Sequence, residues 1–325
     1  MVLICAGLLW PMACPAPLIY VPGEGWHYEP VGGGASWTRT RAKDQLEVAK
    51  EAFAKKDYSL ALKAAKRTAS VWPFSDYAAE AQFMVGACYE AKKKDQAAFK
   101  AYQKLIKEHP KQENYDEVVR RQFEIANRFL NGQWFKAWNF IPLAPSMERT
   151  IKLYEDVIKN GPYSAVAPKA QMNIAAAYEN KVMPDYESAA KAYEKAADRY
   201  SDQPIGVDAL FLVGVTYHKL AKEAEYDQSV ASKAINTFSD FVALHPKDAR
   251  VDQAKAKMLE LQTEQARGAF EVARFYEKRR KWHGASVYYN EVLDKDAKSS
   301  YADEARVRLE AINQRQRNEP PRAAK

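Results

Sequence analysis

The chain has little of what several protein classes require. Its 325 residues contain three cysteines, 13 glycines and 16 prolines. Three cysteines cannot form a dense disulfide framework, and the spacing of Cys5, Cys14 and Cys88 fits no zinc motif. The glycine and proline contents are too low for a collagen or a low-complexity linker protein. Beyond the first residues no apolar run approaches the roughly 18 needed to cross a bilayer, which excludes a multipass membrane protein.

The charge also lacks a strong bias of one sign. Lysine and arginine number 49 and aspartate and glutamate 42, a net charge of +7, and both signs are interleaved along the chain. This pattern gives no reason to expect a nucleic-acid partner. Hydrophobic residues make up 47% and charged residues 28%, which is typical of a soluble globular chain. Length alone favours two domains of about 150 residues each, an estimate that the repeats below replace.

The first 14 residues have the features of a signal peptide. Residues 2–10 form an uncharged apolar run with the length of a secretory h-region. Ala13 directly before Cys14 fits a bacterial lipoprotein signal, although the two residues before Ala13 fit it poorly. We therefore assign residues 1–14 as a signal peptide, of the lipoprotein type if Cys14 is acylated. An ordinary cleaved signal and a buried N-terminal strand are the alternatives.

Residues 15–41 are expected to form an extended tether, because their prolines and glycines leave no room for a helix. Four aromatic residues are unusual for a solvated linker and favour a strand-like segment laid against the helical body, with a fully mobile tether as the alternative. They are Tyr20, Trp26, Tyr28 and Trp37.

A 34-residue spacing pattern organises the chain from residue 42 onward. In residues 79–112 a small residue and an aromatic residue are followed by small, aromatic and proline residues: Gly86, Tyr89, Ala98, Tyr102 and Pro110. The small residues let two helices approach closely, the aromatic residues fill their interface, and the proline ends the second helix. This spacing resembles the tetratricopeptide repeat, a helical hairpin.

The same pattern recurs in six copies, which predicts an all-α fold, a right-handed tetratricopeptide-repeat solenoid over residues 42–312 with an extended N-terminal segment. The copies lie near residues 42–75, 79–112, 119–164, 168–201, 207–248 and 266–299. A further helix rich in Lys, Glu and Gln is expected over residues 247–265. The polar residues 313–325 are expected to form a frayed tail.

Two stretches carry a closer resemblance. Trp72-Pro73-Phe74-Ser75-Asp76-Tyr77 follows the first repeat, and Val272-Ala273-Arg274-Phe275-Tyr276-Glu277-Lys278-Arg279-Arg280-Lys281-Trp282 lies in the last. They are similar to hallmarks of the BamD-like family, the tetratricopeptide lipoproteins of the outer-membrane β-barrel assembly machinery. The resemblance covers residues 42–130 and 232–312. Residues 168–201 stand as an additional repeat, and Arg280 replaces the family's usual glycine.

This resemblance implies a scaffold on the periplasmic face of the cell outer membrane, held there by a lipid on Cys14. Its partners would be proteins, in particular the barrel-inserting outer-membrane subunit, which the C-terminal repeats dock in that family. The alternative is a soluble periplasmic adaptor that binds peptides or components of the cell envelope and secretion machinery.

No motif for catalysis, metal binding or phosphate binding occurs in the chain. His109 and His245 occupy the same position before the terminal proline of two different repeats, so they are expected at separate levels of the solenoid. Most acidic residues lie at helical spacings from Lys or Arg, which is typical of surface ion pairs. We therefore predict a non-enzymatic protein without a cofactor or a metal.

Two stretches are candidate partner-binding surfaces. The insertion 131–145 concentrates Trp134, Phe135, Trp138 and Phe140. Such a loop either packs on the solenoid or offers an apolar surface to a partner or a membrane. The turn of the sixth repeat combines basic and aromatic residues, with a solvated helix end as the alternative: Lys278, Arg279, Arg280 and Trp282.

Asn127 and Asn173 are candidate groove residues. They fall on two positions of the carboxylate clamp found in one variant of the tetratricopeptide family. The basic positions of that clamp are occupied by Phe123, Asp208 and Leu212, so the clamp is incomplete. Solvated groove asparagines are the alternative.

Overall fold

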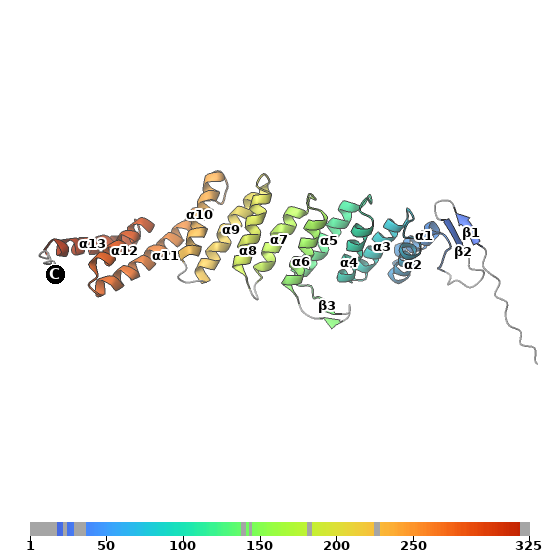
Figure 1. Cartoon of the computed structure of the whole chain (residues 1–325), viewed down its shortest axis with the longest axis horizontal. Helices are drawn as coiled ribbons and strands as arrows, with labels where there is room; N and C mark the ends of the chain where they lie inside the picture. The colour runs from blue at the N-terminus through green and yellow to red at the C-terminus, as the bar shows by residue number, and fades with distance from the viewer. Residues whose placement is uncertain are drawn as a thin grey trace, which may run out of the picture. The chain divides into compact units, whose positions relative to one another are not determined.

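The computed structural model describes residues 18–21, 25–28, 37–137, 141–142, 145–180, 184–223 and 228–318. Within these residues the fold is dominated by helices that pack in sequence order, so the predicted all-α class is confirmed (Figure 1). The chain divides into two compact units, residues 1–146 and 147–325. The signal peptide with Cys14, as well as Trp138 and Phe140, lie outside the described residues.

Unit 1 contains two short β-hairpins and the first five helices. These elements are β1 (Leu18–Val21), β2 (Gly25–Tyr28), α1 (Ala42–Ala54), α2 (Tyr58–Val71), α3 (Ala78–Ala91), α4 (Asp95–Glu108), α5 (Tyr115–Leu130), β3 (Lys136–Ala137) and β4 (Ile141–Pro142). Helices α1 and α2 form one packed pair and α3 and α4 the next, and α5 packs against α4.

Unit 2 contains the remaining helices. These are α6 (Met147–Asn160), α7 (Ala167–Tyr178), α8 (Tyr186–Arg199), α9 (Pro204–Glu223), α10 (Gln228–Leu244), α11 (Val251–Lys278), α12 (Trp282–Lys295) and α13 (Ser300–Asn318). Each packs on the helix that follows it. The boundary between the units falls inside the third predicted repeat, with α5 in one unit and α6 in the other.

The segment predicted as an extended tether contains the antiparallel hairpin of β1 and β2, in which Tyr20 pairs with Trp26. The rings of these two residues contact each other with centroids 5.2 Å apart, and both are exposed, so they do not pack on the helical body. Pairing of the two strands satisfies backbone groups that an isolated extended segment would leave to water. Trp37, by contrast, packs on the core of the first helix pair, as predicted for the aromatic residues of this segment.

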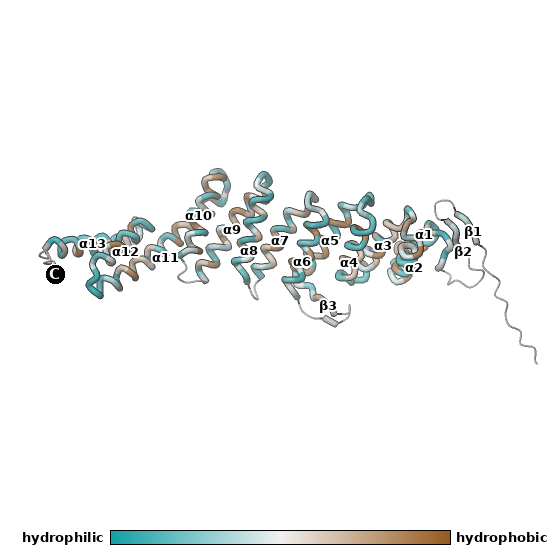
Figure 2. Tube along the Cα trace, viewed as in Figure 1, coloured by the Kyte–Doolittle hydropathy of each residue, from teal (hydrophilic) through white to brown (hydrophobic). Residues whose placement is uncertain are grey.

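Close helix contacts depend on small residues, as the spacing pattern predicts. A Cβ at Gly86 of α3 would overlap the buried ring of Tyr102 on α4. A Cβ at Gly214 of α9 would lie 2.6 Å from the ring of Phe238 on α10. Apolar and polar residues are interspersed along the helices, as expected when one face of each helix packs and the other is solvated (Figure 2). Among the described helices, none combines the length and the hydropathy that a membrane span requires.

Three turns between paired helices carry a basic residue in the left-handed region. Lys56 follows α1 with φ of 61°, Lys93 follows α3 with φ of 53°, and Arg280 follows α11 with φ of 57°. Glycine is the usual residue where a helix ends in this conformation, and an L-residue there costs about 1 kcal/mol. A positive charge just beyond a helix C-terminus interacts favourably with the helix dipole, which offsets part of this cost.

The C-terminal helices are longer than the sequence predicts. Residues 251–265, expected to belong to a separate helix, are continuous with the first helix of the last repeat in α11. No proline interrupts α11, and its only glycine, Gly268, is tolerated in a helix interior. Helix α13 runs to Asn318, six residues into the expected frayed tail, and the Arg315 guanidinium lies over the Trp282 ring at 4.7 Å.

Candidate protein-binding site

An open groove of about 820 Å³ lies in unit 1 along the first helix of each repeat. Its floor is apolar and comes from α1 and α3, with Phe53, Phe83, Met84 and Ala87 among the lining residues. The charged residues on its walls are Glu90, Lys93, Asp95, Arg121, Arg128 and Lys136. Trp134 from the predicted insertion also lines the groove. The groove therefore combines an apolar floor with an excess of positive charge.

The insertion after α5 is anchored by one aromatic ring and presents another. Phe135 is 3% exposed, and its ring stacks on that of Phe129 with centroids 4.1 Å apart. The Gln133 side-chain amide donates to Asp95 at 2.7 Å, and the Lys136 backbone N–H donates to Gln96 at 2.8 Å. Trp134, between these anchors, stays 52% exposed. Both alternatives for the insertion thus occur in it, because Phe135 packs while Trp134 faces outward.

An ion-pair network holds the wall of the groove together. Asp95 is 6% exposed and lies 2.6 Å from an Nη atom of Arg128, across the gap between α4 and α5. Arg121 lies 3.7 Å from Glu90 and over the Phe83 ring at 5.2 Å. Burial raises the pKa of the Glu90 carboxyl, against the opposing effect of the Tyr102 hydroxyl and the two guanidinium groups. The network therefore fixes Arg121 and Arg128 on the wall of the groove, while the apolar floor is open to apolar side chains of a bound segment.

The two groove asparagines belong to different units. Asn127 is a half-buried residue of α5 in unit 1, and it is not among the residues that line the groove. Asn173 is half-buried on α7 in unit 2, where its amide donates to the Tyr154 hydroxyl at 3.2 Å. Their role as ligand-binding residues stays a prediction.

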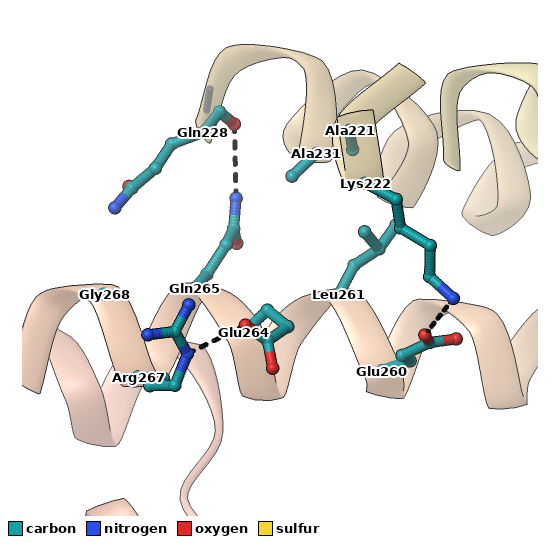
Figure 3. A pocket seen from close by; sticks show the side chains of 10 residues that line it. All are labelled: Ala221, Lys222, Gln228, Ala231, Glu260, Leu261, Glu264, Gln265, Arg267 and Gly268. Carbon is teal, nitrogen blue, oxygen red and sulfur yellow. Dashed lines mark hydrogen bonds and ion pairs between the residues drawn. The ribbon is translucent and has the colours of Figure 1, made fainter. Parts of the chain in front are cut away.

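A second recess lies between α9, α10 and α11 (Figure 3). Its charged groups are paired with one another: Lys222 with Glu260 at 2.6 Å, and Arg267 with Glu264 at 2.9 Å. Gln265 donates to the Gln228 carbonyl at 3.3 Å and so ties α11 to the start of α10. The Lys222 and Gln265 contacts join α11 to α9 and α10, the Arg267 pair lies within α11, and together the two ion pairs leave no excess of one charge.

A third recess brings together most of the basic and aromatic residues predicted at the sixth repeat. It is lined by Glu271, Arg274, Phe275, Glu277, Lys278, Arg280, Trp282 and Arg308. Phe275 is 51% exposed, and the Arg279 guanidinium stacks over its ring at 3.7 Å. Arg274 could have been found from its spacing of four residues before Lys278. Arg308 comes from α13, about 30 residues away, so no local sequence pattern predicts that it lines this recess.

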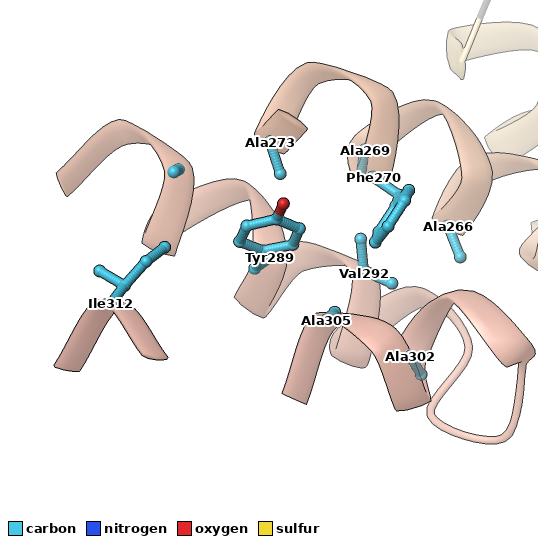
Figure 4. Packing of buried hydrophobic residues seen from close by; sticks show 10 residues of the cluster. Ala266, Ala269, Phe270, Ala273, Tyr289, Val292, Ala302, Ala305 and Ile312 are labelled. Carbon is cyan, nitrogen blue, oxygen red and sulfur yellow. The ribbon is translucent and has the colours of Figure 1, made fainter. Parts of the chain in front are cut away.

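The core beneath this recess explains why its residues are well positioned (Figure 4). Alanines of α11 pack against the rings of Phe270 and Tyr289, whose centroids are 5.6 Å apart. The Tyr289 hydroxyl donates to Glu277 at 2.5 Å, and Arg308 lies 3.5 Å from the same carboxylate. Burial and this carboxylate raise the pKa of Tyr289, so it stays a neutral donor. The outer face of α11 is thereby tied to α12 and α13.

The described residues hold no group of three or more His, Cys, Asp or Glu side chains arranged to bind a metal. The lack of an enzymatic activity stays a prediction.

The repeats and their close-packed hairpins define the class of the protein. Residues 80–111 match the tetratricopeptide-repeat family, the segment in which the repeat is clearest in the sequence. Residues 144–324 match a second family, YfiO, described as an outer membrane lipoprotein. This match spans more than half of the chain, and the protein therefore belongs to the YfiO outer membrane lipoprotein family.

The family match lies elsewhere on the chain than the expected resemblance. The hallmarks suggest residues 42–130 and 232–312, whereas the match spans 144–324. The repeat at residues 168–201, expected as an addition to the family pattern, lies inside it. The match also coincides closely with unit 2, residues 147–325. Unit 1 is thus the part of the chain that lies outside the family model.

Solved structures with similar folds are tetratricopeptide proteins of low identity. The C-terminal part of one from Cytophaga hutchinsonii is 15% identical, with 82% of this chain and 87% of that chain covered and a TM-score of 0.36. One from Parabacteroides merdae is 11% identical, covering 84% and 98%, with a TM-score of 0.33. One from Thermus thermophilus is 12% identical, covering 67% and 100%, with a TM-score of 0.30. No curated protein sequence matches the chain.

Proposed function

We propose that the protein is a non-enzymatic scaffold on the periplasmic face of the outer membrane, where it binds partner proteins during outer-membrane protein assembly. The observation that carries this proposal is the family match over unit 2, which contains the exposed Phe275–Arg279 stack. Exposed aromatic and arginine side chains are the residues most often found at the centre of protein interfaces.

The third recess is the surface we assign to the barrel-inserting subunit. It lies in the last repeats, and it offers an exposed ring beside several basic side chains of α11 and α13. The groove of unit 1 is assigned to extended segments of client proteins. Its apolar floor suits alternating apolar side chains, and the excess of positive charge on its walls suits an acidic residue among them.

Affinity purification from detergent-solubilised envelopes tests the proposal. The wild-type chain is expected to retain the barrel-inserting subunit. A variant with Phe275→Ala and Arg279→Ala is expected to retain at least tenfold less of this subunit, because it lacks the proposed contact. Both side chains are exposed, so their removal leaves the core unchanged. A matched control carries Leu244→Ala and Lys247→Ala, which also removes one exposed apolar and one basic residue of unit 2. Absence of the barrel-inserting subunit from the wild-type eluate would refute the proposal.

The second candidate function is a soluble periplasmic adaptor, and the groove of unit 1 favours it because this groove lies outside the family match. The two candidates differ in the lipid on Cys14. Intact-mass measurement of the mature protein, together with fractionation into membrane and soluble periplasm, separates them. A diacylglycerol adduct and membrane association support the scaffold, and an unmodified soluble protein supports the adaptor.

A further inference from the structure

The turns that join paired helices in unit 1 lie side by side along one edge. The turn between α1 and α2 meets the next one where the Lys92 ammonium donates to the Ser59 hydroxyl at 2.5 Å. The turn between α3 and α4 meets the insertion after α5 where the Lys136 backbone N–H donates to Gln96. Lys93, Lys94, Trp134 and Lys136 border one small recess there. These three turns therefore form a continuous surface, which we call the turn edge of unit 1.

The turn edge is strongly basic. Its lysines are Lys55, Lys56, Lys92, Lys93, Lys94 and Lys136. All are exposed except the half-buried Lys92. Two aspartates lie in the same turns, and both are engaged: Asp57 accepts from the Leu60 backbone N–H, and Asp95 pairs with Arg128. Asp57 keeps its negative charge, so the six lysines outnumber the one carboxylate of these turns that is not paired with an arginine. The edge therefore carries an excess of positive charge, although the whole chain is only mildly basic.

The distribution of this charge fits an extended planar partner better than an enclosed ligand. The basic residues are all lysines, compact hydrated charges on flexible stems that suit a diffuse anionic surface, whereas arginine suits a defined carboxylate or phosphate. They are spread over three successive turns. Trp134, held at this edge by the Phe135 anchor, is half-exposed, and tryptophan is enriched where proteins meet the headgroup region of a bilayer.

We propose that the turn edge of unit 1 binds the anionic headgroups of a lipid bilayer, with the lysines facing the headgroups and Trp134 inserted among them. Lysines within a Debye length of an anionic bilayer each strengthen binding about fivefold. This contact is independent of the partner surface proposed for unit 2 and of a lipid on Cys14, whereas it shares Lys93, Trp134 and Lys136 with the groove of unit 1.

Sedimentation with vesicles tests this proposal on the mature chain from residue 15 onward, so that neither an acyl chain nor the apolar signal run contributes. Vesicles of phosphatidylcholine alone are compared with vesicles that contain about 30% phosphatidylglycerol. The chain is expected to bind the anionic vesicles at least tenfold more tightly, and 0.5 M salt is expected to abolish most of the difference. Lys55→Gln, Lys56→Gln, Lys93→Gln and Lys94→Gln together are expected to weaken binding to anionic vesicles at least tenfold. Trp134→Ala is expected to weaken it severalfold.

The matched control removes the same charge elsewhere in unit 1. Lys63→Gln, Lys100→Gln, Lys104→Gln and Lys107→Gln change exposed lysines of α2 and α4 outside the turns, and are expected to weaken binding less than threefold. Equal losses in both quadruple variants would overturn the proposal, because net charge rather than this edge would then drive binding. Equal binding to neutral and anionic vesicles would overturn it too. So would charge-dependent capture of an acidic protein without vesicle binding.

Discussion

The thiol of Cys88 lies in the core of unit 1 against alanines of α1 and α2 and is fully buried. Burial raises its pKa to about 11. At pH 8 we therefore expect a variant with Cys5→Ser and Cys14→Ser to react with Ellman's reagent about two orders of magnitude more slowly when folded than in 6 M guanidinium chloride. Comparable rates in the two states would show that this core opens readily.

His218 is expected to make the stability of unit 2 depend on pH. The side chain is almost fully buried on α9, and its ring Nε2 lies 3.0 Å from a carboxylate oxygen of Glu260 on α11. Desolvation lowers the pKa of His218 below 6.5, although the hydrogen bond that its ring donates to Glu260 opposes this, and the neighbouring Lys257 and Lys222 lower the pKa further. The unfolded chain therefore takes up the proton first as pH falls. Stability is full above pH 6.5 and decreases between this value and the lower pKa of the folded state.

Urea unfolding at pH 7.5 and at pH 5.5 measures this effect. The wild-type midpoint is expected to fall more between the two values than the midpoint of His218→Gln, which lacks the titrating ring. Glu260 does not confuse the comparison, because hydrogen bonds from Lys222 and His218 lower its pKa below 4.5, outside this range. If His218→Gln keeps the full pH dependence of the urea midpoint, another titratable group is responsible for it.

At the residue scale, sequence reasoning located the aromatic insertion but could not say which ring would be buried. Phe135 is buried because Phe129, the last residue but one of α5, offers its ring face, a contact made across the turn that follows the helix. The same limit applies to the third recess. The run from Lys278 to Trp282 is visible in the sequence, whereas Arg308 joins it only because α13 packs back on α11 and α12.

At the scale of the helix, two glycines allow a matched test of packing against propensity. In Gly86→Ala the new methyl group would overlap the ring of Tyr102, which is fully buried and cannot swing away. We expect a net loss of about 1–3 kcal/mol in the free energy of unfolding, although alanine is the better helix former. In Gly268→Ala on α11 the methyl would contact only the end of the Gln228 side chain at 3.4 Å.

Gly268→Ala is therefore expected to stabilise the chain by up to about 1 kcal/mol through helix propensity alone. Chemical denaturation of both variants against the wild type gives the two signs. Equal effects of the two substitutions would show that the packing around Gly86 relaxes around an added methyl group.

The ends of the helices were predictable where the sequence has strong helix-ending or capping residues, and not where it lacks them. Pro73 and Pro110, just beyond the ends of α2 and α4, mark real helix ends, and Asp57 caps α2 through the Leu60 N–H. Between residues 247 and 265 the repeat frame suggested a break, yet helix formers without proline continue into α11. The frayed tail was predicted from the polarity and the two prolines of residues 313–325. Its first residues are helical because Arg315 contacts Trp282.

At the scale of the whole molecule, the family match and the division of the chain coincide. Unit 2 spans residues 147–325, and the outer membrane lipoprotein family matches residues 144–324. The regular repeat spacing predicted one continuous solenoid over residues 42–312, because repeats of similar length do not show where one compact unit ends and the next begins. Unit 1 thus stands as a tetratricopeptide module of its own, with a groove and a basic edge that are not part of the family pattern.

Unit 2 is accordingly expected to fold without unit 1. In repeat proteins each hairpin contacts only its neighbours, so a stack cut at a boundary between compact units keeps its own core. A fragment of residues 147–325 is expected to show helical circular dichroism and one cooperative thermal transition. The control fragment 168–325 lacks α6, whose Tyr154 and Val157 are fully buried, and it should melt at a lower temperature because the face of α7 is uncovered. If the longer fragment is unfolded or no more stable than the shorter one, the boundary does not separate independent units. If it folds and still retains the barrel-inserting subunit in affinity purification, the proposed partner surface lies entirely in unit 2.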